Sequence, residues 1–429
     1  MRILSVSFFL LSALTLQAEW WGFRGPGGNG TSALKSLPTE WSSTKNVAWK
    51  TEIPGRGYSS PVIAGGKVCL TTSTEGDKIP GKKAPEHLLG GKPFLHPQTT
   101  SEDRIVTLKG LCIDAETGKV AWERTVYEGG VFDGRHTFNT FASPTPLTDG
   151  KRVFFYFESQ GLYAFDLNGK ALWKTSIGGV AKAGLAAGTS PILAGGNIIL
   201  QADDDDGKKS FIYGVSPGNG EIVWKTKRET SVTWNTPVVV RHGETEMVVT
   251  AATEHVIAYD PKSGKELWRG PGIEGFGAAS PVSGGGLVFP NAYHPVKKLF
   301  AMNIDPAAKE RVAWKYEKGT AYVPSPIYYD GYLYLTTDAG LLTCMEATTG
   351  KVVYEGKRLP KPAKLTASPV AFDGKLLMTS AEGDTFVIRA GPEHEVLATN
   401  PIGEGVFASL ALDGDSIYIR GDKHLFRIR

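Results

Sequence analysis

The apolar positions of this chain gather in short runs that do not alternate with polar positions. Typical runs are residues 68–70, 153–157 and 376–378. A strand with one face in water alternates apolar and polar side chains, whereas a strand covered on both faces forms a continuous apolar run. The pattern therefore predicts many short strands, each enclosed between two neighbouring sheets.

A Ser/Thr-Pro motif precedes each of these runs, usually with a glycine about five residues further on. The motif recurs every 41–47 residues after a first step of 83. Its copies are marked by Pro61, Pro144, Pro191, Pro237, Pro281, Pro326 and Pro369, with Ser409-Leu410 as a degenerate eighth copy. A fixed period of this length is typical of propellers and other repeat architectures. The copies therefore predict eight blades.

A second motif follows in most copies and consists of a small residue, an acidic residue, a tight turn and a strand with an aromatic residue. Residues 112–122 are the clearest copy, and residues 164–173, 214–224 and 258–268 repeat it, whereas 301–314 and 344–354 are looser. Thr-Gly suits a hairpin turn because glycine adopts positive φ cheaply. We expect the tryptophan in the outermost strand, where its ring covers the blade edge and its N–H meets a carbonyl. These residues are Trp49, Trp122, Trp173, Trp224, Trp268 and Trp314.

The two ends of the repeat region complement each other. The last copy ends at Arg429 without a tryptophan strand, and residues 47–51 form a strand of that kind before the first motif. Sharing one blade between the termini closes the ring and removes exposed sheet edges. We therefore predict an all-β protein whose residues 46–429 form an eight-bladed β-propeller of four-stranded antiparallel blades.

Composition agrees with this fold and excludes one class of partner. The 52 glycines and 26 prolines suit many turns between short strands. Lysine and arginine together number 47 against 44 acidic residues, for a net charge of +3. Because a nucleic-acid partner requires a concentrated basic face, we expect none.

The first 18 residues have the features of a secretory signal peptide. Arg2 precedes an apolar run at residues 4–16, and Gln17-Ala18 provides a small-residue cleavage site. The run is too short to span a bilayer well, so an uncleaved anchor is the weaker alternative. No cysteine lies near the cut, and no second long apolar segment follows. We expect a soluble monomer, periplasmic or secreted, with residues 19–45 as an N-terminal extension.

The cysteines at 69, 112 and 344 are odd in number and widely spaced, which excludes a fully paired disulfide framework. Cys112 and Cys344 each stand two positions before the acidic residue of a repeat, where other copies carry alanine or glycine. We therefore interpret both as small buried filler residues.

The pattern Ala-x-Asp-x-x-Thr-Gly-Lys-x-x-Trp, as in residues 112–122 and 258–268, resembles the pyrroloquinoline-quinone repeat. Proteins with this repeat include the quinoprotein alcohol dehydrogenases and the propeller subunit of the outer-membrane barrel assembly machine, and both are eight-bladed. The resemblance covers roughly residues 46–429. The opening residues 20–30 also resemble the start of repeat proteins of this type whose role is not assigned.

The candidate binding face is the one on which the blade-to-blade connections emerge. Residues 74–103 form a polar insertion in the first blade, and residues 127–141 enlarge the next connection. Insertions on one face often mark a binding face, although tolerated surface loops are the alternative. Aromatic residues a few positions before the proline motifs suit stacking on a planar or sugar ligand, or simple packing between blades. They are Tyr58, Phe141, Trp234, Tyr322 and Phe407.

The polar candidates on this face do not form a diagnostic spacing. They are Arg56, His136, Asn139, Asn235, Glu254, His294 and Glu404. Asp203 and Asp204 begin an acidic run that offers carboxylates to a cation such as Ca²⁺, but the run lacks the ligand spacing of an EF-hand and equally suits a solvated hairpin. Gly25, Gly27 and Gly30 match the dinucleotide-binding fingerprint in spacing alone, because no strand precedes them and no helix follows.

Two functions compete. The first is a non-catalytic binding or scaffolding module for an envelope or extracellular protein, peptide or glycan. The second, implied by the resemblance, is a dehydrogenase that uses pyrroloquinoline quinone and a divalent cation to oxidise an alcohol or sugar. The chain lacks the adjacent cysteine pair common in those enzymes and lacks a Cys-x-x-Cys-His haem motif. We therefore expect no cofactor and favour the scaffold.

Overall fold

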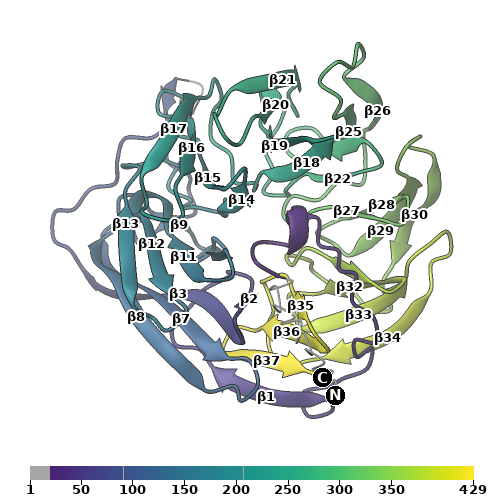
Figure 1. Cartoon of the computed structure of the whole chain (residues 1–429), viewed down its shortest axis with the longest axis horizontal. Coiled ribbons are helices and arrows are strands. Elements are labelled where there is room, and N and C mark those ends of the chain that lie inside the picture. Colours follow the sequence, from purple (N-terminus) through teal and green to yellow (C-terminus); the bar gives the residue numbers. More distant parts are fainter. Residues whose placement is uncertain (1–19, 90, 206) are drawn as a thin grey trace, which may run out of the picture.

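The computed structural model describes residues 20–89, 91–205 and 207–429, and within them the strands form eight radial antiparallel sheets around a central axis (Figure 1). Seven sheets have four strands. The fifth blade has an additional short strand, because Pro290 interrupts its second strand. The predicted all-β eight-bladed propeller is confirmed. The signal peptide predicted for residues 1–18 lies outside the described residues, among which no helix is long and apolar enough to cross a membrane.

Each of the first seven blades runs from the inner to the outer strand in chain order. Blade 1 contains β2 (Val62–Ala64), β3 (Lys67–Lys78), β7 (Arg104–Asp114) and β8 (Val120–Gly130). Blade 2 contains β10 (Leu147–Thr148), β11 (Arg152–Tyr156), β12 (Leu162–Asp166) and β13 (Ala171–Thr175). Blade 3 contains β14 (Ile192–Ala194), β15 (Asn197–Ala202), β16 (Phe211–Val215) and β17 (Ile222–Lys227). Blade 4 contains β18 (Val238–His242), β19 (Thr245–Ala251), β20 (His255–Tyr259) and β21 (Glu266–Pro271).

The second half of the ring repeats this order. Blade 5 contains β22 (Val282–Gly284), β23 (Leu287–Phe289), β24 (Asn291–Ala292), β25 (Lys298–Asn303) and β26 (Val312–Tyr316). Blade 6 contains β27 (Ile327–Tyr329), β28 (Tyr332–Thr336), β29 (Leu341–Glu346) and β30 (Val352–Arg358). Blade 7 contains β31 (Val370–Phe372), β32 (Lys375–Thr379), β33 (Asp384–Arg389) and β34 (Val396–Pro401). Blade 8 contains β35 (Ala411–Asp413), β36 (Ser416–Arg420) and β37 (His424–Ile428).

The N-terminal strand β1 (Val47–Glu52) completes blade 8 by pairing with β37. Val47 lies opposite Ile428 and Glu52 lies opposite His424. The strands from the two ends of the chain lie side by side at the bottom of Figure 1. Ring closure by strands from both ends, as the unmatched tryptophan strand predicted, is confirmed.

The Ser/Thr-Pro motif joins neighbouring blades through a belt of hydroxyl groups. In seven successive pairs, the backbone N–H of one motif residue donates to the hydroxyl oxygen of the next, over 2.8–3.0 Å. This gives each of these N–H groups a partner at a place where no sheet provides one. The residues are Ser60, Thr145, Ser190, Thr236, Ser280, Ser325, Ser368 and Ser409.

The belt corrects the position of the motif in blade 2. The sequence offers two overlapping candidates there, Ser143-Pro144 and Thr145-Pro146, and we expected the first. Thr145 is the residue whose hydroxyl accepts from Ser60 N and whose N–H donates to the Ser190 hydroxyl. The motif of blade 2 therefore lies two residues later, and Phe141 does not occupy the position that Tyr58 occupies in blade 1.

The outer-strand tryptophans connect each blade to the turn of the next. The indole N–H of Trp224 donates to Pro261 O over 3.1 Å, and four other tryptophans make the same contact. Gly264, at φ +70°, lies under the Trp224 ring, so closely that a Cβ there would be 2.4 Å from the ring. Trp268 differs, because its N–H has no partner among the described residues and Arg311 lies 4.3 Å from its ring centroid instead. The tryptophan and the glycine of the repeat thus form one joint between blades.

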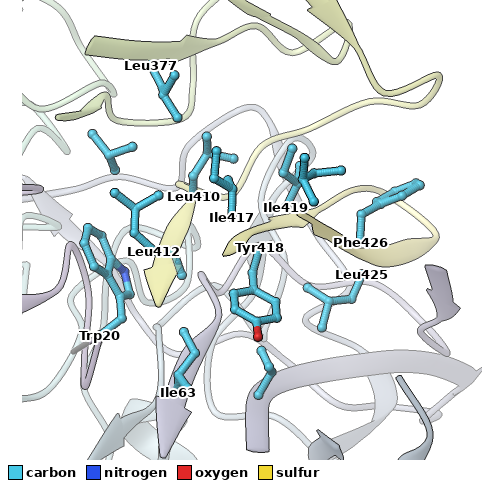
Figure 2. Packing of buried hydrophobic residues seen from close by; sticks show 14 of the residues in the cluster. Trp20, Ile63, Leu377, Leu410, Leu412, Ile417, Tyr418, Ile419, Leu425 and Phe426 are labelled. Carbon is cyan, nitrogen blue, oxygen red and sulfur yellow. The ribbon is translucent and has the colours of Figure 1, made fainter. Parts of the chain in front are cut away.

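Residues 20–32 run across the inner strands of the ring, where their backbone pairs with Ile63, Thr148 and Ala371. They include the short 3-10 helix η1 (Pro26–Gly28), which lies near the ring centre beside β18 and β22 in Figure 1. Arg24 is fully buried and donates to Pro326 O at 2.8 Å and Pro369 O at 3.4 Å, on the inner strands of blades 6 and 7. Trp20 joins the core of blades 7, 8 and 1 (Figure 2).

Two cysteines form a disulfide that the sequence interpretation missed. Cys69 on β3 and Cys112 on β7 are direct cross-strand partners with Cα atoms 4.1 Å apart. The interpretation of Cys112 as a filler residue is therefore wrong. The long insertion between the two strands made it hard to recognise from the sequence that they pair. Cys344 is free and buried, as expected, and burial raises the pKa of its thiol to about 12.

Candidate functional site

The described part of the predicted insertion, residues 74–89 and 91–103, lies on the face where the blade-to-blade connections emerge. We call the insertion the strap and this face the rim. Strands β3 and β7 extend beyond the blade before the chain turns back through β4 (Leu88–Leu89), β5 (Lys92–Pro93) and β6 (Thr99–Thr100). Strand β6 pairs with β9 (Arg135–His136) in the second lengthened connection. The two lengthened segments that the sequence assigned to one face therefore contact each other.

An ion pair fastens the base of the strap. Arg135 Nε donates to Glu75 Oε1 over 2.5 Å, and Ser101 donates to the other oxygen of the same carboxylate. Burial opposes ionisation of Glu75, but these hydrogen bonds and the guanidinium charge lower its pKa. The carboxylate therefore stays charged and holds both ends of the strap to the connection.

A buried histidine fastens the middle of the strap. His87 Nδ1 lies 2.7 Å from Asp205 Oδ2 in blade 3, and Nε2 lies 3.1 Å from Asp133 Oδ1 in the connection between blades 1 and 2. Burial disfavours the charged imidazole, but the hydrogen bond to Asp205 and the ion pairing with both carboxylates outweigh it and raise the pKa to about 9. His87 therefore joins the strap to the connection between blades 1 and 2 and to blade 3.

Further buried charges lie beneath this contact. Lys182 is 0% exposed and lies 3.2 Å from Glu158 Oε1 in η2 (Glu158–Gln160), and it donates to Thr233 O. Burial raises the pKa of Glu158 to about 7, although Lys182 opposes the rise. Unpaired buried charges are costly, so this network favours a single arrangement of the loops.

The two aspartates proposed as cation ligands have other partners. Both Asp203 oxygens contact the buried Arg228, at 2.7 and 3.2 Å. Asp204 accepts hydrogen bonds from Lys209 N and Ser210 within its own hairpin. Among the described residues, no group of three or more His, Cys, Asp or Glu could hold a metal ion. Arg228 supplies the positive charge beside Asp203 that a bound cation would otherwise supply.

The aromatic candidates separate into groups around the rim. Tyr58 and Phe407 stack with ring centroids 4.5 Å apart, and Arg56 donates to the Tyr58 hydroxyl. Trp234 covers Gly188 and donates to Ala186 O. Tyr322 packs edge-on against Tyr293, 5.8 Å away. Phe141 is buried in the hydrophobic cluster shared by blades 1 and 2.

The polar candidates mostly hold loops in place. His136 contacts Gln98 at 2.8 Å, and burial, followed by His96 and Arg135, lowers its pKa. Asn139 donates to Leu185 O across the blade boundary, and the buried Asn235 donates to Ala251 O. His294 is exposed, and its backbone pairs with Phe276. Glu254 accepts hydrogen bonds from Thr230 and Ser231.

A groove of about 920 Å³ lies between the strap and the rims of blades 3 and 4. The strap contributes Leu89 and Gly91, and Phe276 contributes a second apolar wall. Charged side chains of both signs complete the lining, with Asp205, Lys208, Lys227, Glu229 and Glu254 among them. The groove has the size of a ligand site. Of the rim candidates predicted from the sequence, Glu254 alone lines it.

A family model described as outer membrane protein assembly factor BamB matches residues 96–210 and 208–429. The chain belongs to this BamB family. A search among curated proteins gave no match.

Two solved structures share the fold of this BamB-family chain. BamB from Moraxella catarrhalis superposes with a TM-score of 0.55 at 14% identity, covering 83% of this chain and 100% of that one. The quinohemoprotein alcohol dehydrogenase from Comamonas testosteroni gives a TM-score of 0.64 at 11% identity, covering 97% of this chain and 81% of that one. At these identities the likeness shows the fold alone.

Sequence reasoning missed the charged residues that fix the strap of this BamB-family protein. His87 and Asp205 are 118 positions apart, and Asp133 lies in a third loop. A lone histidine in a polar loop is usually solvated, so nothing local distinguishes His87. The available signal was the strap itself, because a long insertion needs anchoring contacts if it is ordered.

Proposed function

We propose that this protein is an exported binding and scaffolding module that holds a segment of an envelope protein in the groove beside the strap. The observation that carries the proposal is the strap fixed by His87 between Asp133 and Asp205. A rigid wall of this kind preserves the shape of the groove before a partner arrives, which reduces the entropy cost of binding.

The surface chemistry of the groove supports a protein segment as the ligand. Leu89 is partly exposed at one wall, and Phe276 lies at the other. Lysines and glutamates surround these two apolar residues. Protein interfaces commonly combine an apolar centre with a charged margin.

Export is supported by two independent features. The first 18 residues have the pattern of a secretory signal. The disulfide between Cys69 and Cys112 suits an oxidising compartment such as the periplasm or the extracellular space.

The dehydrogenase alternative has less support. The disulfide joins residues 43 positions apart inside blade 1 and does not supply the adjacent cysteine pair that the resemblance implies for those enzymes. Asp203, the proposed cation ligand, is paired with Arg228. We therefore propose no chemical step.

Photo-cross-linking from inside the groove tests the proposal. A photoreactive residue at Leu89 should give discrete protein adducts in envelope preparations, and the same residue at Val352 on the outer strand of blade 6 should not. The added substitution Phe276→Asp should reduce the Leu89 adducts at least tenfold without lowering the melting temperature. Equal adducts from both positions, or none from Leu89, would contradict the proposal.

A further inference from the structure

A second pocket, of about 350 Å³, lies on the face opposite the groove. The N-terminal segment forms one wall, and the inner strands of blades 2, 3 and 4 form the other. Its apolar lining includes Trp21, Phe23, Leu147, Ile192, Leu193 and Val239.

The inner strands of the ring pair with extended backbone from the N-terminal segment. Ile63 N donates to Trp20 O in blade 1. In blade 7, Ala371 N donates to Gly30 O and Ser32 N donates to Ala371 O, which gives a parallel bridge between Thr31 and Ala371. The inner edge of a blade in this protein therefore already accepts a passing peptide chain.

The corresponding edges of blades 3 and 4 remain open. Leu193 and Val239 are the second residues of their inner strands, as Ile63 and Ala371 are of theirs. Because backbone N–H groups alternate in direction along a strand, the amides of Leu193 and Val239 point inward in the same way. The described part of the chain supplies neither amide with a partner on that side. An unpaired strand edge of this kind is a template for a further strand.

Glycines keep the opposite wall of the pocket thin. Gly27 and Gly28 adopt φ of +64° and +76°. A Cβ on Gly28 would meet nothing closer than Phe23 O at 3.9 Å, so the space beside it is empty. The glycine-rich opening that matched a dinucleotide fingerprint by spacing alone thus forms the bare wall of this pocket.

The charges at the pocket compensate each other. Arg241 pairs with Glu246, whose other carboxylate oxygen accepts the Gly195 N–H over 2.6 Å. The lining therefore offers an apolar surface and free backbone groups but no net charge. This combination favours a neutral ligand with peptide groups and an apolar side chain.

We propose that this pocket binds a short extended segment of a partner protein. The segment pairs with the backbone of Leu193 and inserts one aromatic or aliphatic side chain against Trp21, Phe23 and Val239. It would repeat in blade 3 the pairing that the N-terminal segment makes with Ala371 in blade 7.

Nuclear magnetic resonance of the deuterated protein, titrated with N-acetyl-Gly-Phe-Gly-amide, tests the pocket. The backbone amides of Leu193 and Val239 and the Trp21 indole should shift saturably. N-acetyl-Gly-Ser-Gly-amide, which lacks the apolar side chain, should bind at least tenfold more weakly. No saturable shift up to about 5 mM, or equal binding of the serine peptide, would overturn the proposal.

Two variants separate the side-chain pocket from backbone pairing. Val239→Trp fills the pocket and should weaken the phenylalanine peptide at least tenfold, whereas Val223→Trp on the outer strand of blade 3 should not. Leu193→Pro removes the inward N–H on an edge strand, where proline is tolerated, and replaces one apolar lining side chain with another. It should weaken the peptide but leave the binding of 4-methylphenol unchanged. Unaltered peptide affinity in either pocket variant would refute the proposed mode.

Discussion

Replacement of His87 by leucine should release the strap from the rim. His87 bridges Asp133 and Asp205, and its side chain is 2% exposed. Both carboxylates keep backbone donors without it, since Lys182 N donates to Asp133 and Ala183 N donates to Asp205. Without the imidazole, these two buried carboxylates would have no cation between them. Leucine cannot pair with either carboxylate, so the strap should open locally while the propeller stays folded.

The size of the effect follows from the pKa of His87, which is about 9 in the folded protein against an ordinary value of 6.5. A rise of this size corresponds to at most about 3 kcal/mol of preference for the closed strap. Because the pKa is higher when the strap is closed, this contribution is complete below about pH 6.5 and is lost as the pH rises through about 9. Strap opening should accordingly become roughly 100-fold more favourable between these pH values.

Hydrogen exchange of the Phe94 amide measures this opening, because that N–H donates to His87 O within the strap. In the wild-type protein its protection, corrected for intrinsic exchange, should be constant below about pH 6.5 and fall towards pH 9. In His87→Leu it should be low at every pH. His136→Leu is the matched control, since its histidine lies on the same rim without a carboxylate partner. Protection that does not depend on pH in the wild type, or that survives in His87→Leu, would refute the reasoning.

Three further perturbations address the scaffold. Trp224→Ala should destabilise the protein by about 3–5 kcal/mol, because it loses the packing on Gly264 and the hydrogen bond to Pro261. His136→Ala should leave the melting temperature nearly unchanged. Equal losses in the two variants would show that Trp224 does not join neighbouring blades. Gly264→Ala should lower the free energy of unfolding by about 2 kcal/mol or more beyond the loss in Gly243→Ala, measured by chemical denaturation. Both glycines have positive φ, but of the two only at Gly264 would a Cβ strike a tryptophan ring. Similar losses would mean that the ring moves aside freely. The disulfide joins residues 43 positions apart, and its reduction should lower the free energy of unfolding by about 4 kcal/mol. The loss should appear as a lower melting temperature in reducing buffer. An unchanged melting temperature of the fully reduced protein would indicate that the strap already restrains these strands.

The sequence predicted those features whose signal is local and repeated. The tryptophan, the turn glycine and the motif hydroxyl recur once per blade, so each copy supports the others. Where two local solutions overlap, as with Ser143-Pro144 and Thr145-Pro146, periodicity cannot choose between them, and the hydrogen-bond belt decides. The fold was therefore predictable, and the register of one blade was not.

The site was far less predictable, because its parts come from different loops. The groove combines residues of the strap and of two blades, and the ionic contacts beneath it join residues up to 118 positions apart. Asp203 looked like a cation ligand because Arg228, 25 positions away, cannot be recognised as its partner from sequence. The partners of a buried charged residue depend on how the loops pack against each other. Irregular loops have no repeated sequence pattern from which this packing could be predicted.

The pairing of β1 with β37 also sets the order in which this chain can mature. Val47 meets Ile428 only after every intervening blade has been made, so the last sheet cannot complete itself early. Contacts this distant along a chain form slowly, and until they do β1 presents a free edge able to recruit other strands. A nascent chain therefore remains an open arc until β37 pairs with β1 and closes the ring. Premature termination shortly before His424 would consequently leave β1 without its partner strand.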